Sequence, residues 1–289
     1  MLVTWRYRDR KSLIQGFDPS AWFIFYFCFI VATLFFWDLR YLAFFAAIAL
    51  FVVFRSGITF RESRRTWLFI GAFITFFALL TFLTGRGGVE VYEEEHILRT
   101  YQAGFQIFGW RPTLNISAER LMFAIAQLAR VFSLASTTIL IPYSINPAHY
   151  GIAFRRLGLP DKIAYAMDLT MRFIPTFGRD FQLTMDAQKA RGYELEKIQG
   201  GLIKQVRKLA PILVPVTIRA ISGSEDIIDA MDLRAFGTGP RTWLIRLRYR
   251  RRDYALMAFG AIILLGSLLL SLFGYGQFWV PRALLALAA

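Results

Sequence analysis

Two short stretches of the sequence combine acidic, basic and aromatic residues in the same order. DAQKARGY occupies Asp186–Tyr193 and DAMDLRAF occupies Asp229–Phe236. Each starts with Asp-Ala and continues, after three residues, with an arginine, a small residue and an aromatic residue. The chemistry lies in Arg191 and Arg234, because a guanidinium binds carboxylates or carbonyls through paired hydrogen bonds and never loses its charge. The pattern therefore predicts two similar docking groups.

Helix capping is the alternative interpretation of these octapeptides. Arginine in a last helical turn interacts favourably with the negative end of the helix dipole, and a small residue after it commonly ends a helix. Asp186 and Asp229 would then lie on a solvated helix face. Capping alone requires neither the Asp-Ala start, nor the aromatic finish, nor a second copy at the same spacing. We therefore favour a partner with two similar pockets, of which a pair of ABC-type ATPases is the best-known membrane-bound example.

Two long helices are expected to position the arginines. The first begins at Pro160 and runs to Arg191, where Gly192 supplies a C-terminal stop. Pro175 should kink it, because proline removes a backbone donor from the helical ladder. The second helix begins after two glycines at 200–201, contains Pro211 and Pro215, and closes around 234–237.

A shorter helix precedes them. The stretch NPAHYGIAFRRLGLP at Asn146–Pro160 begins with Asn-Pro, a combination typical of a helix start, and Gly158 is a good helix stop. These helices carry apolar residues on one face and charges on the other, which favours amphipathic helices that lie at a membrane surface. The alternative is that Ile203–Ile221 crosses the membrane, as a sixth span in addition to the five described below.

The composition places these helices in a membrane protein. Hydrophobic residues make up 56% of the 289 residues and charged residues 19%, against roughly 45–50% and 25% in a soluble domain. The single cysteine, Cys28, excludes an internal disulfide. The basic N-terminus lacks the pattern of a cleavable signal, so the first apolar segment is expected to direct insertion itself.

Apolar segments predict an all-α, polytopic fold with about five transmembrane helices. A crossing needs about 20 apolar residues, and the second segment is short by this measure. One re-entrant hairpin formed by the first two segments is therefore an alternative. The segments lie near Ser20–Trp37, Tyr41–Phe54, Thr66–Thr84, Leu121–Ile141 and Tyr254–Phe273.

Lysine and arginine predict the orientation of these helices. The N-terminal stretch, the connection between the second and third segments, and RLRYRRRD at Arg246–Asp253 are basic, whereas Gly85–His96 is acidic. Basic connections stay in the cytoplasm, so five crossings place the N-terminus inside and the C-terminus outside. The net charge of +14 suits this face and the anionic inner leaflet, so no nucleic-acid binding is expected. Glu93–Glu95 should be a solvated outer loop, with a cation-attracting vestibule as the alternative.

The chain is thus expected to have three parts in a cell membrane. Residues 1–145 would form four spans, 146–253 a cytoplasmic module, and 254–289 a C-terminal span. Arg130 lies within the fourth span among polar residues and should face the bundle interior, because a membrane-embedded charge is costly. It would form a buried structural pair or contact a substrate-binding partner.

The motifs of catalysis and metal binding are missing from the sequence. GRGG at Gly85–Gly88 lacks the lysine and the context of a phosphate-binding loop. His96 and His149 lie far apart without spaced partner ligands. We therefore expect no catalytic residue, no metal site and no cofactor on this chain, and ATP bound by partner subunits.

The sequence resembles a known family, the transmembrane T component of energy-coupling factor transporters, which includes the cobalt- and nickel-type permeases. The resemblance covers most of the chain and is densest over 141–237. It rests on NPAHYGIAFRRLGLP, on MRFIPTFGRDFQLTMDAQKARG (Met171–Gly192), on LVPVTIRAISGSEDIIDAMDLRAFG (Leu213–Gly237), and on FDPS (Phe17–Ser20) before the first span.

The resemblance implies coupling helices that each end in a small-Arg-small triplet, whose arginine docks in a groove of one ATPase. The matching triplets are Ala190-Arg191-Gly192 and Leu233-Arg234-Ala235. Leu233 departs from the pattern, because a small residue is usual there. Asp186, Asp229, Pro175 and Pro215 would support these helix ends.

The expected function is that of a coupling subunit in an energy-coupling factor type ABC importer. It would transmit ATP-driven motion from two ATPases to a separate, small integral membrane subunit that binds a vitamin or a transition metal. One alternative is a self-sufficient ABC permease with its own substrate path. A membrane-embedded lipid-modifying enzyme is another, but the sequence lacks the clustered acidic or histidine residues that it needs.

Overall fold

The computed structural model describes residues 7–10, 12–84, 97–102, 113–193, 202–239 and 247–281. The chain divides into two compact units. One unit comprises Arg8–Ile145 and the chain from Tyr249 onward, and the other contains Asn146–Arg248. The acidic stretch Gly85–His96, with the predicted outer loop at Glu93–Glu95, lies outside the described residues.

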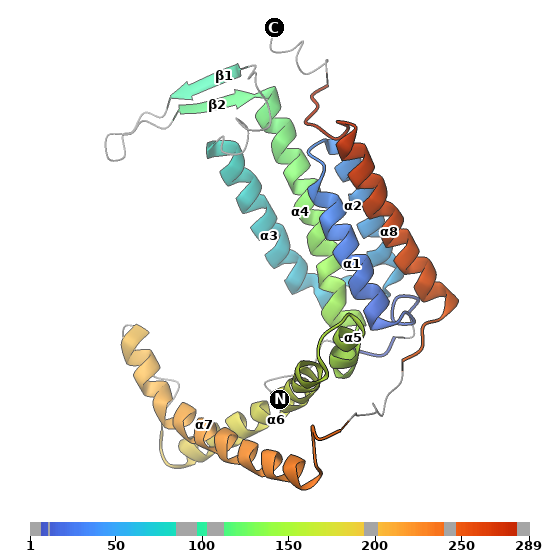
Figure 1. Ribbon diagram of the computed structural model, residues 1–289. Helices are drawn as coiled ribbons and strands as arrows, with labels where there is room; N and C mark the ends of the chain where they lie inside the picture. Colours follow the sequence, from blue (N-terminus) through green and yellow to red (C-terminus); the bar gives the residue numbers. More distant parts are fainter. Residues whose placement is uncertain are drawn as a thin grey trace. The chain divides into compact units, whose positions relative to one another are not determined.

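Within the described residues, the first unit is a bundle of five helices (Figure 1), and each predicted apolar segment coincides with one of them. α1 packs against α8, whereas α4 packs against both α2 and α3. α1 and α2 thus have different principal partners, as expected of two separate helices and not of a re-entrant hairpin. The helices are α1 (Pro19–Leu34), α2 (Leu39–Arg55), α3 (Phe60–Thr84), α4 (Ala118–Ser144) and α8 (Arg251–Leu272).

Short polar side chains begin α1, α2 and α4. Asp18, Asp38 and Ser117 each accept a hydrogen bond from a backbone N–H two or three residues further along the chain. Such caps typically contribute about 1 kcal/mol each, because they satisfy donors that the first helical turn leaves unpaired. Asp18 belongs to the FDPS stretch, and Pro19 occupies the first turn, where a missing donor costs nothing.

Aromatic and small side chains fill the interior of the bundle. Phe25 and Phe29 of α1 are fully buried. Phe25 stacks against Phe259 of α8 with ring centroids 6.1 Å apart, and Phe29 meets Phe45 of α2 edge to face at 5.3 Å. A Cβ on Gly260 would lie only 3.2 Å from the Phe25 Cα. The glycine therefore permits the close approach of α1 and α8.

One buried carboxylate joins the N-terminal ends of α1 and α8. Asp253 is 1% exposed. Its Oδ1 accepts a hydrogen bond from the Asp18 N–H at 2.9 Å, and its Oδ2 accepts one from the Arg250 N–H at 2.7 Å. The same side chain thus caps α8 and holds the start of α1.

Among the described helices, α3, α4 and α8 are long and apolar enough to cross a membrane. α1 has 16 residues and α2 has 17. Their length of about 24–26 Å at 1.5 Å per residue is slightly less than the hydrocarbon core of about 30 Å. The helical, polytopic architecture is confirmed, while the number of five crossings stays a prediction.

A small β-hairpin was not predicted. β1 (Ile97–Gln102) pairs antiparallel with β2 (Thr113–Ser117), and the register shifts between Ile97 and Arg99. It lies in the connection between α3 and α4. The helical periods that identify the spans carry no information about such a connection, and the few separate β-branched residues of the two strands are a weak local signal.

The second unit contains η1 (Pro147–His149), α5 (Tyr150–Arg156), α6 (Asp161–Ala190) and α7 (Leu202–Leu233). Asn146 caps the first turn by accepting a hydrogen bond from the Ala148 N–H at 3.0 Å. Gly158 has a positive φ of 104° after α5, a conformation that glycine adopts without a steric cost. α6 begins and ends within one residue of its predicted bounds, and α7 begins where predicted and ends at Leu233, just before its predicted close around 234–237.

α5 lies tightly against α6. The Gly151 N–H donates to Asp168 Oδ1 at 2.9 Å, and a Cβ on Gly151 would lie 2.3 Å from the Ala164 carbonyl oxygen. Desolvation raises the pKa of Asp168, while the Gly151 hydrogen bond and nearby His149 act in the opposite direction. The contact therefore depends on a glycine that no larger residue can replace.

α7 is one helix of 32 residues that continues through Pro211 and Pro215. It is not among the described helices that meet the length and hydropathy of a membrane crossing. Val214, Ile218 and Ile221 are exposed and share one helix face by their spacing. This pattern favours an amphipathic helix over a sixth crossing.

Candidate functional site at the ends of α6 and α7

α6 and α7 pair in antiparallel orientation. The Gln188 side chain donates to the Pro211 carbonyl at 3.1 Å, and the rings of Tyr165 and Phe236 lie 4.6 Å apart. The end of α6 therefore lies beside the first half of α7, and the end of α7 lies beside the start of α6. Asp180 and Arg219, 3.9 Å apart, connect the middle of the pair.

This pairing places the two arginines at opposite ends of the second unit's long helices. Arg191 ends α6, whereas Arg234 lies two residues before Phe236, which contacts the second turn of α6 at Tyr165. At 1.5 Å per residue, Tyr165 and Arg191 are about 40 Å apart along the α6 axis. The arrangement suits two separate docking points.

The two octapeptides end their helices with the same backbone hydrogen bonds. The Tyr193 N–H donates to the Gln188 carbonyl at 3.0 Å, and the Phe236 N–H donates to the Met231 carbonyl at 2.9 Å. These are equivalent positions of the two octapeptides. Each bond reaches back five residues, which is the outer bond of a Schellman motif.

The inner bonds of the motif also match. The Gly192 N–H donates to the Lys189 carbonyl and the Ala235 N–H to the Asp232 carbonyl, both at 2.9 Å. Gly192 has φ +85° and Ala235 has φ +51°. Among the described residues, Ala235 is the only non-glycine residue with a positive φ. A left-handed alanine costs about 1–2 kcal/mol relative to an ordinary conformation.

Helix capping therefore accounts for more of the octapeptide than its sequence suggests. The left-handed position requires a small residue, and the aromatic residue after it occupies the position that packs back on the helix. Phe236 also contacts the neighbouring helix α6, through the ring of Tyr165. Nothing in the capping motif requires Arg191 or Arg234. These arginines are the part of the pattern that docking must explain.

Both helix ends are accessible. Arg191, Ala190 and Gly192 are exposed at the end of α6. Arg234 and Ala235 are exposed at the end of α7, and the Leu233 side chain has 90% of its surface exposed. Arg234 also lines a groove between α6 and α7. The structure thus presents both predicted triplets at the surface.

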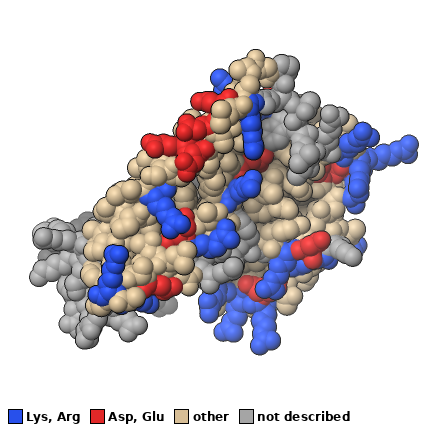
Figure 2. Space-filling model, turned by 90° about the horizontal axis from the view of Figure 1, so that it is seen from below, with Lys and Arg blue, Asp and Glu red and all other residues tan. Residues whose placement is uncertain are grey.

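The acidic residues differ between the two ends. The face shown in Figure 2 carries one larger group of acidic side chains and several smaller ones among the Lys and Arg side chains. At the end of α6, exposed Asp186 has the nearby positive charge of Lys189. The last three turns of α7 instead expose the carboxylates of Glu225, Asp226, Asp229 and Asp232. The α7 end is therefore the more negative of the two.

The supporting prolines lie inside continuous helices. α6 continues without interruption through Pro175, and α7 likewise continues through Pro215. The kink expected at Pro175 stays a prediction. Pro215 is exposed on α7, and Pro175 is half-buried.

Arg130 occupies the interior of the membrane bundle, as predicted, with 8% of its surface exposed. Its guanidinium donates to the Phe36 carbonyl and lies 4.3 Å from the Trp37 ring centre. Within the described residues it forms no ion pair, so the predicted buried pair is replaced by a backbone carbonyl and an aromatic ring. That carbonyl follows the end of α1, where a positive charge is favourable.

The fold is that of a polytopic helical membrane protein with an exposed arginine at the end of each of two long helices. The sequence matches the profile of the CbiQ family, described as cobalt transport protein, over residues 10–243. This chain belongs to that family. The resemblance drawn from its motifs is therefore confirmed.

The individual relatives carry the name energy-coupling factor transporter transmembrane protein EcfT. The protein of Staphylococcus aureus is 26% identical over 264 residues, which cover 87% of this chain and 90% of that protein. The protein of Thermosediminibacter oceani is 28% identical over 268 residues, covering 91% and 96%. The protein of Exiguobacterium sibiricum is 32% identical over 176 residues, covering 58% of this chain and 64% of that protein.

Proposed function

We propose that this chain is the transmembrane coupling subunit of an energy-coupling factor type ABC importer. In this proposal, Arg191 and Arg234 each dock in a groove of one ATPase subunit. The α6–α7 pair then transmits ATP-driven motion to a separate integral membrane subunit that binds a vitamin or a transition metal. The names of the relatives support this assignment, since each is a transmembrane protein of an energy-coupling factor transporter.

The observation that carries the proposal is the duplicated helix end. One capped helix end needs no partner to explain it, but two exposed arginines on matched caps at opposite ends of a helix pair suit a partner with two grooves. The planar guanidinium offers a fork of donors for carboxylates or carbonyls. Small neighbours such as Ala190 and Gly192 let the α6 end approach a groove closely.

ATP binding is assigned to the partners, because the chain has no phosphate-binding loop. The purified chain alone is expected neither to bind nor to hydrolyse ATP. Activity should appear only when two nucleotide-binding subunits are purified with it. Nucleotide binding by the isolated chain, free of contaminating ATPases, would instead favour the membrane-enzyme alternative.

The second unit and the N-terminus are proposed to be cytoplasmic and the C-terminus external. The charge of the bundle supports this, because Arg55, Arg61, Arg64 and Arg65 lie where α2 ends and α3 begins, and α8 begins with further arginines. Single cysteines at Glu94 and Lys197 in a Cys28→Ser background should react with an impermeant thiol reagent from opposite sides. Reaction of both from one side would contradict this topology.

Co-purification of the ATPases tests the docking role. The double variant Arg191→Ala, Arg234→Ala is expected to fold, insert and lose both ATPases. Lysine at both positions should restore binding poorly, because it keeps the charge without the fork. A double-alanine protein that still carries its ATPases would reduce both arginines to helix caps, whose loss costs at most about 1 kcal/mol of stability.

A transport assay distinguishes the proposed coupling subunit from the alternative of a self-sufficient permease. Proteoliposomes that contain this chain and the ATPases alone should not transport substrate. Adding the substrate-binding subunit should restore uptake. Uptake without that subunit would favour a permease with its own path.

A further inference from the structure

A pocket of about 620 Å³ opens where α2 ends and α3 begins. Its lining includes Arg8, Arg10 and Arg55, together with Phe54 and Leu13. α3 is long and apolar enough to cross a membrane, and its charged residues, Arg61, Glu62, Arg64 and Arg65, all lie in its first two turns. The pocket therefore lies at the level where the hydrocarbon core meets the headgroup region.

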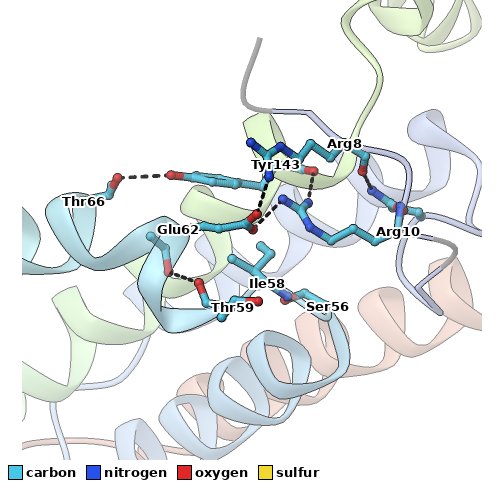
Figure 3. A network of polar contacts seen from close by, with 10 residues as sticks. Arg8, Arg10, Ser56, Ile58, Thr59, Glu62, Thr66 and Tyr143 are labelled. Atoms are coloured by element: carbon cyan, nitrogen blue, oxygen red, sulfur yellow. Dashed lines mark hydrogen bonds and ion pairs between the residues drawn. The ribbon is translucent and has the colours of Figure 1, made fainter. Parts of the chain in front are cut away.

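One carboxylate in the pocket is already neutralised. Glu62 lies between two arginines (Figure 3): its Oε1 is 2.8 Å from Arg8 and its Oε2 is 2.8 Å from Arg10. Arg10 also donates to the Tyr143 carbonyl at 3.1 Å, and the Tyr143 hydroxyl lies 3.3 Å from that of Thr66. Both oxygens of Glu62 thus hold the N-terminal segment on α3, and Arg10 also joins that segment to α4.

Arg55 keeps its charge uncompensated. Within the described residues it forms no ion pair, and its guanidinium lies 5.6 Å from the Phe51 ring centre. Arg40 at the other end of the same helix differs, since its guanidinium lies 2.6 Å from Asp38 and stacks 4.1 Å from the Trp279 ring centre. Asp9 is the second carboxylate that lines the pocket, and it too is already engaged in an interaction. α2 therefore ends in the pocket with a free cation.

Apolar side chains surround this cation. Phe51 is 61% exposed, Phe54 is 77% exposed and Leu13 is 59% exposed. Exposed phenylalanines beside a cation at the membrane boundary match a ligand with an anionic head and hydrocarbon chains. Basic pockets between transmembrane helices bind acidic lipid headgroups in this manner.

We propose that this pocket binds one anionic phospholipid. Its phosphate would lie against Arg55 and the outer edge of Arg8, and its acyl chains along Phe51 and Phe54. A zwitterionic lipid supplies the same chains but brings its own cation, so it should bind less tightly. The site is independent of the ATPase-docking ends.

Native mass spectrometry of the detergent-purified chain tests the site, with phosphatidylglycerol and phosphatidylcholine as probes. The wild type is expected to retain one phosphatidylglycerol in preference to phosphatidylcholine. Arg55→Gln should weaken phosphatidylglycerol binding by about fivefold, since one arginine near an anionic surface contributes about 1 kcal/mol. Arg61→Gln is the matched control, because Arg61 is exposed nearby on α3 but does not line the pocket.

The outcomes separate a site from general surface charge. The pocket is supported if phosphatidylglycerol binding falls about fivefold in Arg55→Gln and less than twofold in Arg61→Gln. Thermal unfolding should be unchanged in both variants. Equal losses in both variants would overturn it. Displacement of the lipid by millimolar inorganic phosphate would also overturn the assignment, because a phospholipid is held by its chains as well as its head. Phe54→Ser should weaken both lipids alike, and an unchanged affinity would remove the chain-binding part of the proposal.

Discussion

The α6 and α7 ends share a backbone and differ in almost everything that it carries. Equivalent hydrogen bonds close both helices, and a left-handed residue follows each arginine. At α6 that residue is Gly192 and the arginine follows Ala190. At α7 it is Ala235 and the arginine follows Leu233, which is 90% exposed. A duplicated local structure therefore presents two different surfaces.

The charges deepen this difference. Negative side chains near a helix C-terminus are unfavourable, because that end of the helix dipole is itself negative. α7 nevertheless exposes Glu225, Asp226, Asp229 and Asp232 before Arg234. In the proposed complex, the matched backbone positions the two arginines alike, while their unlike surroundings would need grooves of unlike shape and charge. The two docking sites are thus expected to differ in affinity.

Single arginine variants give the largest expected effect. Arg191→Ala and Arg234→Ala should each weaken their own docking site by about 30-fold to several-thousand-fold, since losing one member of a desolvated charge pair costs roughly 2–5 kcal/mol. Each protein should keep its complex through the other end, because the tethered contact is effectively intramolecular. Dissociation rates of the ATPases measure both effects. Rates within twofold of wild type for both variants would contradict docking, and unequal rates would rank the two ends.

Exchanging the residues before the arginines tests the shape difference. Leu233→Ala should weaken ATPase binding at the α7 end by about 10- to 100-fold, because burying a leucine contributes about 1.5–3 kcal/mol. Stability should change by less than about 0.5 kcal/mol, since the side chain is exposed in the free chain. Ala190→Leu is the reciprocal control and should weaken the α6 end through a clash. Unchanged affinity in Leu233→Ala would show that the leucine stays outside the groove.

Exchanging the left-handed residues tests the shared backbone. Gly192→Ala should destabilise the α6 end by about 1–2 kcal/mol, and Ala235→Gly should stabilise the α7 end by a similar amount. Hydrogen exchange at the Tyr193 and Phe236 amides should change about fivefold or more, in opposite directions. Gly223→Ala in the interior of α7, where φ is ordinary and space is open, should not slow or speed exchange at Tyr193. Equal responses of both ends would contradict the strain assigned to Ala235.

The smallest expected effect is a pH dependence of stability that comes from Asp168, an acidic residue of α6 away from the helix ends. Desolvation raises the pKa of Asp168 on α6 above its ordinary value of 3.8. The folded state then holds its proton to higher pH than the unfolded state, so stability falls as the pH rises through the raised pKa. Asp168→Asn should remove this slope in thermal unfolding between pH 4 and 7. Asp229→Asn on exposed α7 is the matched control, and a slope that survives in Asp168→Asn would assign it to another group.

The sequence predicted the helices well, because their signals are local. Apolar runs located α1 to α4 and α8, and the glycines and prolines that start and end helices located α6 and α7. The octapeptides correctly marked helix ends. The antiparallel pairing of α6 and α7 was not predicted, since contacts such as Tyr165 with Phe236 leave no periodic trace in the sequence.

Several site features also depend on tertiary structure. Arg130 was expected in the interior, but its partners, the Phe36 carbonyl and the Trp37 ring, belong to another helix end. The left-handed conformation of Ala235 was not predicted, because alanine seldom adopts it. The pocket at Arg55 joins an N-terminal segment to the α2–α3 corner. Only the fold brings such residues together.

The link between Asp18 and Asp253 has a consequence for synthesis of the chain. α1 packs chiefly on α8, and their connecting hydrogen bond spans 235 positions. At about 5–20 residues per second, translation leaves α1 without this partner for roughly 10 to 50 seconds. Phe25, fully buried in the finished bundle, would spend that interval against lipid or an insertion factor. α1 is thus synthesised long before α8 but reaches its final packing only when α8 is complete.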